Sequence, residues 1–182
     1  MKALDRLLQK YRILKAARYI TRGMSVLDIG CDDGTLFQAL EDRISRGVGV
    51  DPLDHPWRIG DRFQRITGSF PEDVPHLGEF DAITMLAVLE HFPADKLQTM
   101  PGSCAKYLKS GGLLIITMPS PIVDYILLVL QWIRLIDGMS LEEHHGLPAK
   151  VIPTIFCHKY FTLKVKKSFQ FGLNNLFVFQ KK

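Results

Sequence analysis

The chain has 182 residues, 47% of them hydrophobic, which is enough for one domain (1–182) with a single core. Its net charge of +4 is too small to indicate nucleic-acid binding, and its three scattered cysteines suit a reducing compartment and lack the spacing of metal ligands. Charges interrupt every apolar run near the N-terminus and no run reaches 18 apolar residues, so we expect a cytoplasmic protein without a signal peptide or spanning helix.

Residues 3–20 are predicted to form an amphipathic helix within a basic N-terminal segment, 1–22. Five apolar side chains share one face of it: Leu4, Leu7, Leu8, Tyr11 and Leu14. Residues 1–22 also carry seven basic groups against a single acid, Asp5. Two interpretations stay open: a packing or lid helix with its basic face in solvent, or a helix that contacts a membrane surface or an anionic substrate.

The rest of the chain alternates strand and helix patterns. Strands are predicted at 25–30, 47–51, 63–67, 80–85 and 113–118, and helices at 35–42 and 93–108, with Gly111-Gly112 marking the end of the second helix. This alternation indicates a parallel sheet with right-handed crossovers. Two β-rich runs, 161–169 and 176–180, follow without room for a helix between them, so a C-terminal hairpin should make the last strand antiparallel to its neighbour.

Two neighbouring motifs predict an adenosine-binding site. The first strand runs into a glycine-bearing turn, Asp28 to Gly34, and the next strand ends in Asp51, 21 positions beyond Gly30. Such a turn admits a ligand close to the backbone, and the later acid can accept both ribose hydroxyls. A nicotinamide fingerprint would need glycine where Asp32 and Thr35 stand, and carboxylates beside a pyrophosphate are unfavourable. A cationic cofactor is therefore favoured.

Five segments in order give the chain a family resemblance: Leu27–Gly34, Gly49–Asp51, Phe80–Ile83, Val88–His91 and Leu108–Gly112. It resembles the class I S-adenosylmethionine-dependent methyltransferases, especially the small single-domain group. The resemblance implies a Rossmann-like, doubly wound α/β sheet of seven strands, mostly parallel, in which the hairpin supplies the reversed strand. It also implies S-adenosyl-L-methionine as cofactor and S-adenosyl-L-homocysteine as product. Asp32 stands where the family usually has glycine; we interpret it as a tolerated variant, because aspartate adopts left-handed backbone readily.

By this resemblance the cofactor site comprises thirteen residues: Asp28, Gly30, Cys31, Asp32, Gly34, Asp51, Pro52, Leu53, Ser69, Phe70, Met85, Leu86 and Ala87. Asp28 would support the loop or meet the methionine end, Gly30 would let backbone approach the cofactor, and Asp51 would accept from the ribose. Pro52 and Leu53 would flank the adenine. Ser69-Phe70 would contact the adenine or form an ordinary turn. The backbone carbonyls of 85–87 would reach the methionine ammonium.

The segment 119–158 is predicted to be an insertion that shapes the acceptor site. Its stretch 122–136 is broadly apolar, and a buried helix, a homodimer surface, and a wall for a greasy acceptor or membrane contact are all open interpretations. His144 and His145 follow and are candidate bases, with a polar surface loop as the alternative; His91 is a third candidate. No metal site is expected, because adjacent histidines point apart and no i,i+4 pair exists.

We therefore expect a methyltransferase that moves the methyl group of S-adenosylmethionine in line to a small or lipid-linked acceptor, with peripheral membrane contact left open. Nucleic acid is not an expected substrate, since Leu86-Ala87-Val88-Leu89 stands where a base-flipping motif would follow the fourth strand. One alternative is a catalytically silent S-adenosylmethionine-binding or scaffold protein on the same fold. An NAD-dependent oxidoreductase is less favoured.

Overall fold

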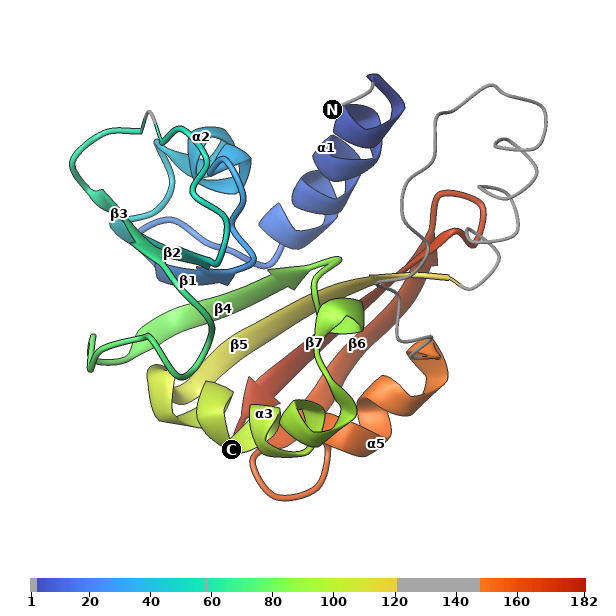
Figure 1. Ribbon diagram of the computed structural model, residues 1–182. Helices are drawn as coiled ribbons and strands as arrows, with labels where there is room; N and C mark the ends of the chain where they lie inside the picture. The colour runs from blue at the N-terminus through green and yellow to red at the C-terminus, as the bar shows by residue number, and fades with distance from the viewer. Residues whose placement is uncertain (1–2, 58, 121–147) are drawn as a thin grey trace.

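A computed structural model describes residues 3–57, 59–120 and 148–182 (Figure 1). Within them, seven strands form one sheet in the order β3-β2-β1-β4-β5-β7-β6. The strands are β1 Ser25–Ile29, β2 Arg46–Asp51, β3 Phe63–Thr67, β4 Phe80–Leu86, β5 Leu108–Pro119, β6 Phe161–Phe169 and β7 Asn174–Lys181. The first five pair in parallel, and β7 runs antiparallel to both β5 and β6. The predicted α/β fold, with its reversed last strand, is confirmed.

Helices cover both faces of the sheet. They are α1 Ala3–Ala17, α2 Thr35–Leu40, η1 Leu89–His91, α3 Ala94–Tyr107, η3 Ala149–Val151 and α5 Ile152–Phe156. α1 and α2 lie on one face, and α3 and α5 lie on the other, which Figure 1 shows above and below the sheet. Both faces of the central strands are therefore covered, as expected of parallel strands that are almost wholly apolar.

Strand β5 shows how one apolar run serves both layers. Ile115 packs in the core under α1 and α2, while Leu114 and Ile116 pack in the core under α3 and α5. Successive side chains of a strand point to opposite faces, so a continuous apolar run fills both cores. All three side chains are fully buried.

The glycine pair at 111–112 does not end a helix, and that expectation is wrong. α3 ends at Tyr107, and both glycines lie inside β5. The register with β4 jumps from Phe80 opposite Leu108 to Ala82 opposite Leu113, so extra β5 residues bulge out between them. Gly111 has a left-handed φ of 75°, which glycine adopts without strain.

The packing face of α1 also differs from expectation. The helix begins and ends near the predicted bounds, but the leucine-rich face does not pack on the sheet: Leu7 and Leu14 are 51% and 61% exposed, and Tyr11 is 45% exposed. The helix instead buries Ala16 and Ala17, which, together with Ile13, face the sheet. Small alanines let the helix approach the strands closely, and this outweighs the larger apolar area of the leucines.

Only part of the predicted insertion falls in the described residues. Its apolar stretch 122–136 and the segment 142–145 lie outside them. The later part forms η3 and α5, where Ile152 and Phe156 are fully buried. The Phe156 ring lies 5.4 Å from the ring of Phe179 in β7, so α5 closes the core beside α3. Among the helices of the described residues, none has the length and apolar character needed to cross a membrane.

Candidate cofactor site at the strand ends

The carboxyl ends of β1, β2 and β4 meet at one edge of the sheet. The chain leaves β1 toward α2 on one face and leaves β4 toward η1 and α3 on the other (Figure 1). In the strand register, Asp28 lies opposite Gly49 of β2 and Thr84 of β4. Open α/β sheets bind ligands in the crevice at such a switch point. The predicted strand ends therefore border one candidate site.

Asp28 is the buried acid at the centre of this edge. It is 3% exposed, and its Oδ1 accepts a hydrogen bond of 2.6 Å from the Thr84 hydroxyl. Burial raises the pKa of Asp28 to about 8; the Thr84 hydrogen bond opposes this rise, and the charge of Asp51 adds to it. The side chain is therefore mostly protonated at neutral pH. A cation bound beside it would favour the ionised form.

Asp51, at the end of β2, is held by two backbone donors. Its Oδ2 accepts from the N–H of Asp32 and its Oδ1 accepts from the N–H of Leu53, both at 2.9 Å. Each carboxylate oxygen has two acceptor positions, so both oxygens keep one for a ligand. The two backbone bonds fix the carboxylate beside the glycine turn.

A set of contacts that the sequence did not indicate ties the β2–β3 connection to the glycine turn. Asp32 has a left-handed φ of 47°, as expected for a tolerated replacement of glycine, and its carboxylate pairs with Nδ1 of His55. Arg65 of β3 donates to the carbonyl oxygens of Leu53 and His55. We call Asp32, His55 and Arg65 the β2–β3 clasp. It gives the unusual Asp32 a partner in addition to the cofactor contact expected from the resemblance.

The glycines of the turn are required by the packing of the chain itself. A Cβ on Gly30 would lie 2.2 Å from a Val88 methyl, and a Cβ on Gly34 would lie 2.3 Å from Ile59 and 2.8 Å from Trp57. Both glycines have left-handed φ angles, 76° and 77°. Gly30 still borders the cavity described below. The structure places Gly34 against the β2–β3 connection, a packing role that the resemblance does not suggest.

Cys31 packs into the core beneath the turn. It is buried, and its Sγ lies 2.6 Å from where a Cβ of Gly49 would stand, so position 49 has no room for a side chain beside Cys31. Burial, reinforced by the charges of Asp28 and Asp51, raises the pKa of the Cys31 thiol far above its usual range. The thiol is therefore neutral. Cys31 contributes to the site through the backbone of the turn and not through its side chain.

A cavity of about 230 Å³ opens beside the turn. Four predicted cofactor residues and one candidate base line it: Gly30, Pro52, Ser69, Phe70 and His91. Seven further lining residues were not predicted: Ile29, Val50, Gly68, Val88, Phe92, Pro93 and Lys96. Ligand pockets typically hold roughly 300–1,000 Å³, so this cavity suits one planar part of a ligand, such as a nucleobase, with the remainder along the strand ends.

The end of β4 borders the same switch point without lining the cavity. Met85 is fully buried, and Leu86 is half-buried. The chain leaves the sheet at Ala87, which has a left-handed φ of 58° and donates its N–H to the carbonyl of Thr117 at 2.9 Å. Leu53, the remaining predicted residue, is 59% exposed and does not line the cavity.

Of the three candidate bases, the structure places one. His91 ends η1, is exposed, and lines the cavity. His144 and His145 lie outside the described residues. Within residues 3–57, 59–120 and 148–182, no cluster of three or more His, Cys, Asp or Glu side chains is arranged to hold a metal ion.

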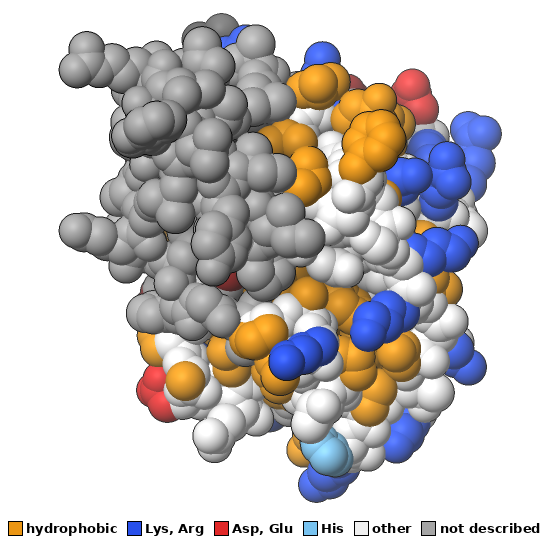
Figure 2. All heavy atoms as spheres, turned by 90° about the vertical axis from the view of Figure 1, so that its right-hand side faces the viewer, with side chains coloured by type: hydrophobic (Ala, Val, Ile, Leu, Met, Phe, Trp, Pro, Cys, Tyr) orange, Lys and Arg blue, Asp and Glu red, His pale blue; other side chains and the backbone are white. Residues whose placement is uncertain are grey.

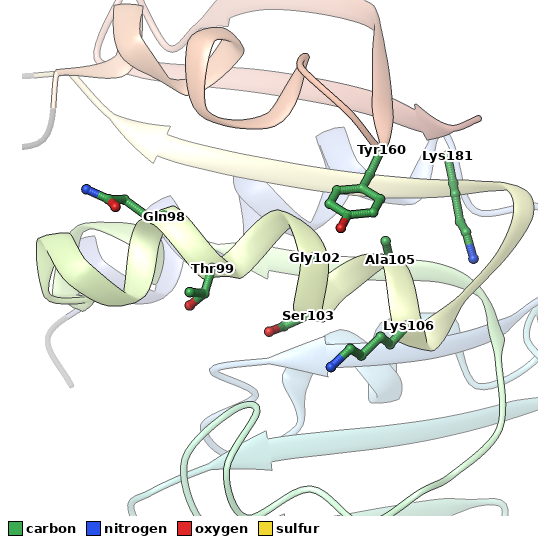
Figure 3. A pocket seen from close by; sticks show the side chains of 8 residues that line it. All are labelled: Gln98, Thr99, Gly102, Ser103, Ala105, Lys106, Tyr160 and Lys181. Carbon is green, nitrogen blue, oxygen red and sulfur yellow. The ribbon is translucent and has the colours of Figure 1, made fainter.

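A larger cavity, of about 550 Å³, lies at the opposite edge of the sheet between α3 and the start of β6 (Figure 3). Its walls are Gln98, Thr99, Gly102, Ser103, Ala105, Lys106, Tyr160 and Lys181. Figure 3 shows the Tyr160 ring pointing toward α3, with the two lysines near one end. No carboxylate lines this cavity, and Asp28 and Asp51 lie at the other edge. The strand-end cavity is therefore the better cofactor site despite its smaller size.

Comparison with known proteins agrees with this geometry. Residues 2–149 match a family model described as a methyltransferase domain. The chain belongs to the class I S-adenosylmethionine-dependent methyltransferases. This membership confirms the predicted family and decides against the oxidoreductase alternative.

Among curated proteins, this methyltransferase-family chain is similar to the ubiquinone biosynthesis O-methyltransferase of Dechloromonas aromatica, with 32% identity over 101 residues. The match covers 50% of this chain and 42% of that enzyme, so the chain spans less than half the length of the relative.

Solved structures share the fold. The PH0226 protein from Pyrococcus horikoshii has a TM-score of 0.75 and 16% identity, covering 100% of this chain and 93% of that one. The 1,6-didemethyltoxoflavin-N1-methyltransferase of Burkholderia thailandensis has a TM-score of 0.74 and 16% identity, covering 96% of this chain and 78% of that one. At this level of identity, the likeness supports the fold alone.

Proposed function

We propose that this protein binds S-adenosylmethionine at the strand-end site and transfers its methyl group to a small or lipid-linked acceptor. The observation that carries the proposal is the pair of buried acids, Asp28 and Asp51, on either side of the Gly30 turn at the switch point. Family membership supports it, and so does the Burkholderia structure, which contains S-adenosylhomocysteine and a small substrate.

The residues present fit this cofactor. Asp51 offers two aligned acceptor oxygens for a pair of ribose hydroxyls, and the cavity between Pro52 and Phe70 suits adenine. Asp28 lies where a carboxylate would stabilise a cationic methionine end. Asp32 and Asp33 place carboxylates inside the turn, where a dinucleotide would need room for its pyrophosphate, so the turn disfavours a dinucleotide.

In methyl transfer, the main task of the protein is to align the cofactor with the acceptor. The cofactor, when bound, supplies an activated methyl group, which is the difficult part of the reaction. The chain contributes a fixed ribose acceptor, an apolar cavity wall and exclusion of water, which together hold the reacting atoms in line. An oxygen acceptor would also need a base, and His144, His145 and His91 remain the proposed candidates.

The acceptor is proposed on weaker support than the cofactor. The curated relative acts in ubiquinone biosynthesis, and the structural relative carries a bound toxoflavin precursor, so a small organic acceptor is our leading choice. A lipid-linked acceptor, peripheral membrane contact and a homodimer remain proposals, as do the segments 1–22 and 119–158 as distinct parts of a single domain. Leu86-Ala87-Val88-Leu89 stands where a base-flipping motif would follow β4, so nucleic acid is not among the acceptors we propose.

A catalytically silent cofactor-binding protein is the second candidate, because the clasp between Asp32 and His55 occupies a position where the family usually has glycine. Turnover separates the two. The full chain would be incubated with S-adenosylmethionine and a panel of phenolic, carboxylate and amine acceptors, and release of S-adenosylhomocysteine would be measured. Release with any acceptor supports the enzyme. Binding without release on every acceptor supports the silent protein.

A further inference from the structure

Helix α1 carries an exposed apolar stripe. Leu7, Tyr11 and Leu14 are spaced four and three residues apart, so they lie above one another on one side of the helix. Each is between 45% and 61% exposed. Isolated exposed leucines are common on protein surfaces, but three large apolar side chains aligned on one helix form a patch that calls for an occupant.

The stripe points away from the sheet. Ile13, Ala16 and Ala17 are the side chains of α1 that pack against the sheet, and a helical projection centres this packing face roughly 150° around the helix from Leu7 and Tyr11. The occupant of the stripe therefore approaches from the side of α1 that faces away from the sheet.

Cations surround the stripe. Arg6 and Lys10 are exposed on the same helix, Arg18 is exposed directly after its last residue, and residues 6–22 contain no Asp or Glu. The same holds for residues 148–182, so these two segments together carry 13 Lys and Arg and no acid, whereas the rest of the chain carries 10 Lys and Arg against 19 acids. Positive charge is thus concentrated in residues 6–22 and 148–182, and the rest of the chain is acidic.

The two basic segments meet in space. The Arg12 Nε donates to Asn174 Oδ1 of β7 at 3.1 Å, and the Lys15 ammonium lies 5.9 Å from the Phe169 ring of β6. Figure 2, which looks onto the β6–β7 edge of the molecule, shows many more Lys and Arg than Asp and Glu side chains, with hydrophobic side chains between them. The positive fields of α1 and the hairpin therefore add.

We propose that α1 docks the protein on the surface of a membrane that contains anionic phospholipids. Leu7, Tyr11 and Leu14 would enter the boundary between headgroups and acyl chains, and the cations beside them would contact lipid phosphates. Tyr11 suits this depth because its ring is apolar and its hydroxyl is polar. A helix that lies in the interface needs only an apolar stripe and a basic flank, and α1 has both.

The alternative occupant is a second copy of the chain, and the charges argue against it. Two copies joined through α1 would bring two basic helices together without an acid in residues 6–22 of either copy. Membrane docking goes beyond methyl transfer and does not depend on it, so each of the two proposals can fail alone.

The test is co-sedimentation of the full chain with lipid vesicles. One vesicle type is phosphatidylcholine alone, and the other is an equal mixture of phosphatidylcholine and phosphatidylglycerol. We expect binding to the mixed vesicles, much weaker binding to phosphatidylcholine alone, and loss of binding as salt is raised.

Two surface variants locate the contact. Leu7→Ser/Leu14→Ser should weaken binding to mixed vesicles by about tenfold or more, because each leucine loses its burial in the interface. Lys10→Gln/Arg18→Gln should weaken binding by about fivefold for each cation removed. The matched controls change exposed residues elsewhere and should bind like the unmodified protein: Leu53→Ser for the leucines, and Lys106→Gln/Lys150→Gln for the cations.

All four variants change exposed side chains, and circular dichroism with thermal melting would verify that each is folded. Equal binding to both vesicle types, or to neither, would overturn the proposal. So would full binding of Leu7→Ser/Leu14→Ser. A third result would also overturn the proposal: the unmodified protein is a dimer that does not bind vesicles, and Leu7→Ser/Leu14→Ser is a monomer in size-exclusion chromatography. The stripe would then hold a second copy of the chain.

Discussion

The strand-end site and the α1 surface use charge in opposite ways. Asp28 and Asp51 are buried, and each accepts hydrogen bonds from fixed donors, so each offers an oxygen at a defined position. Lys10 of α1 and Arg18, which directly follows the helix, are exposed to solvent. A buried, hydrogen-bonded charge can select one group of one ligand, whereas exposed charges attract any surface of opposite sign.

This contrast predicts how each region responds to change. Replacing a buried acid removes a specific contact and leaves its former donors without a partner, so the effect is large and confined to one ligand. Replacing one exposed lysine has a small effect that depends on salt. The following predictions begin with the buried acids and the chemistry next to them and end with a half-exposed pair.

The largest effect is expected for Asp51→Ala. Losing a carboxylate that accepts two ribose hydroxyls should weaken S-adenosylmethionine binding by roughly 2–4 kcal/mol, since hydrogen bonds to charged groups are involved. Isothermal titration calorimetry measures the change. Asp54→Ala is the matched control, because Asp54 is exposed three residues further along and should bind as before. An unchanged dissociation constant in folded Asp51→Ala would defeat the assignment.

The next effect concerns the proposed bases. His144→Ala or His145→Ala, whichever removes the base, should lower turnover on the order of 10²-fold while S-adenosylmethionine binding stays the same. His76→Ala serves as the control, since His76 is exposed and lies outside the strand-end cavity. Unchanged turnover in all three variants would remove both histidines from the mechanism and leave His91 to be tested.

Asp28 should make binding depend on pH. Because burial raises the pKa of Asp28 to about 8, the carboxyl must release a proton to pair with a bound cation. Affinity for S-adenosylmethionine should therefore rise with pH up to about 8 and then level off, and calorimetry in buffers of different ionisation enthalpy should detect the released proton. Asp28→Asn should bind more weakly and lose the pH dependence. The same pH dependence in Asp28→Asn would assign it to another group.

The same group should lower stability at high pH. The pKa of Asp28 is higher in the folded chain than its ordinary value of 3.8, so the folded state holds a proton that the unfolded state releases. This contribution is complete below the ordinary value and is lost as pH rises toward about 8, by up to about 1.4 kcal/mol per pH unit. Thermal melts of Asp28→Asn should fall less over this range than those of the unmodified protein. Parallel curves would contradict the assignment.

The smallest effect is expected for the β2–β3 clasp. The side chains of His55 and Asp32 are 43% and 35% exposed, so their pairing should contribute less than about 1 kcal/mol. A double-mutant cycle with Asp32→Asn and His55→Gln, read out as S-adenosylmethionine affinity, measures this coupling. A coupling near zero would mean that the clasp does not order the ribose side of the site. A coupling of several kcal/mol would mean that the pair contributes more to cofactor binding than its solvent exposure suggests.

The sequence was sufficient to predict that Asp28, the glycine turn and Asp51 meet at the strand ends, because its signals are local. The Asp28–Gly34 turn and Asp51 each end a strand, and parallel strands bring their carboxyl ends to one edge, so the meeting of these residues followed from the pattern. The reversed strand β7 followed in the same way, because the residues before it leave no room for a crossover helix.

What the sequence could not indicate depends on contacts between distant residues. The clasp joins Asp32 to His55, and Gly30 is needed because Val88 packs against it, yet neither partner carries a pattern of its own. The one available hint was that the β2–β3 connection holds His55 between two prolines.

The orientation of α1 was also beyond the sequence. A hydrophobic face identified the helix but not which of its faces meets the sheet. Ala16 and Ala17 pack against the sheet because small side chains fit closely over the strands, and Leu7 and Leu14 are exposed. The stripe that resulted is now the basis for membrane docking.

The most direct test of the central claim, that two strand-end acids select a cationic adenosine cofactor, is calorimetry of the unmodified protein with two ligands. S-adenosylmethionine and NAD⁺ would be titrated under the same conditions. The account predicts that S-adenosylmethionine binds and NAD⁺ does not. Binding of NAD⁺ without binding of S-adenosylmethionine, or equal binding of both, would contradict it.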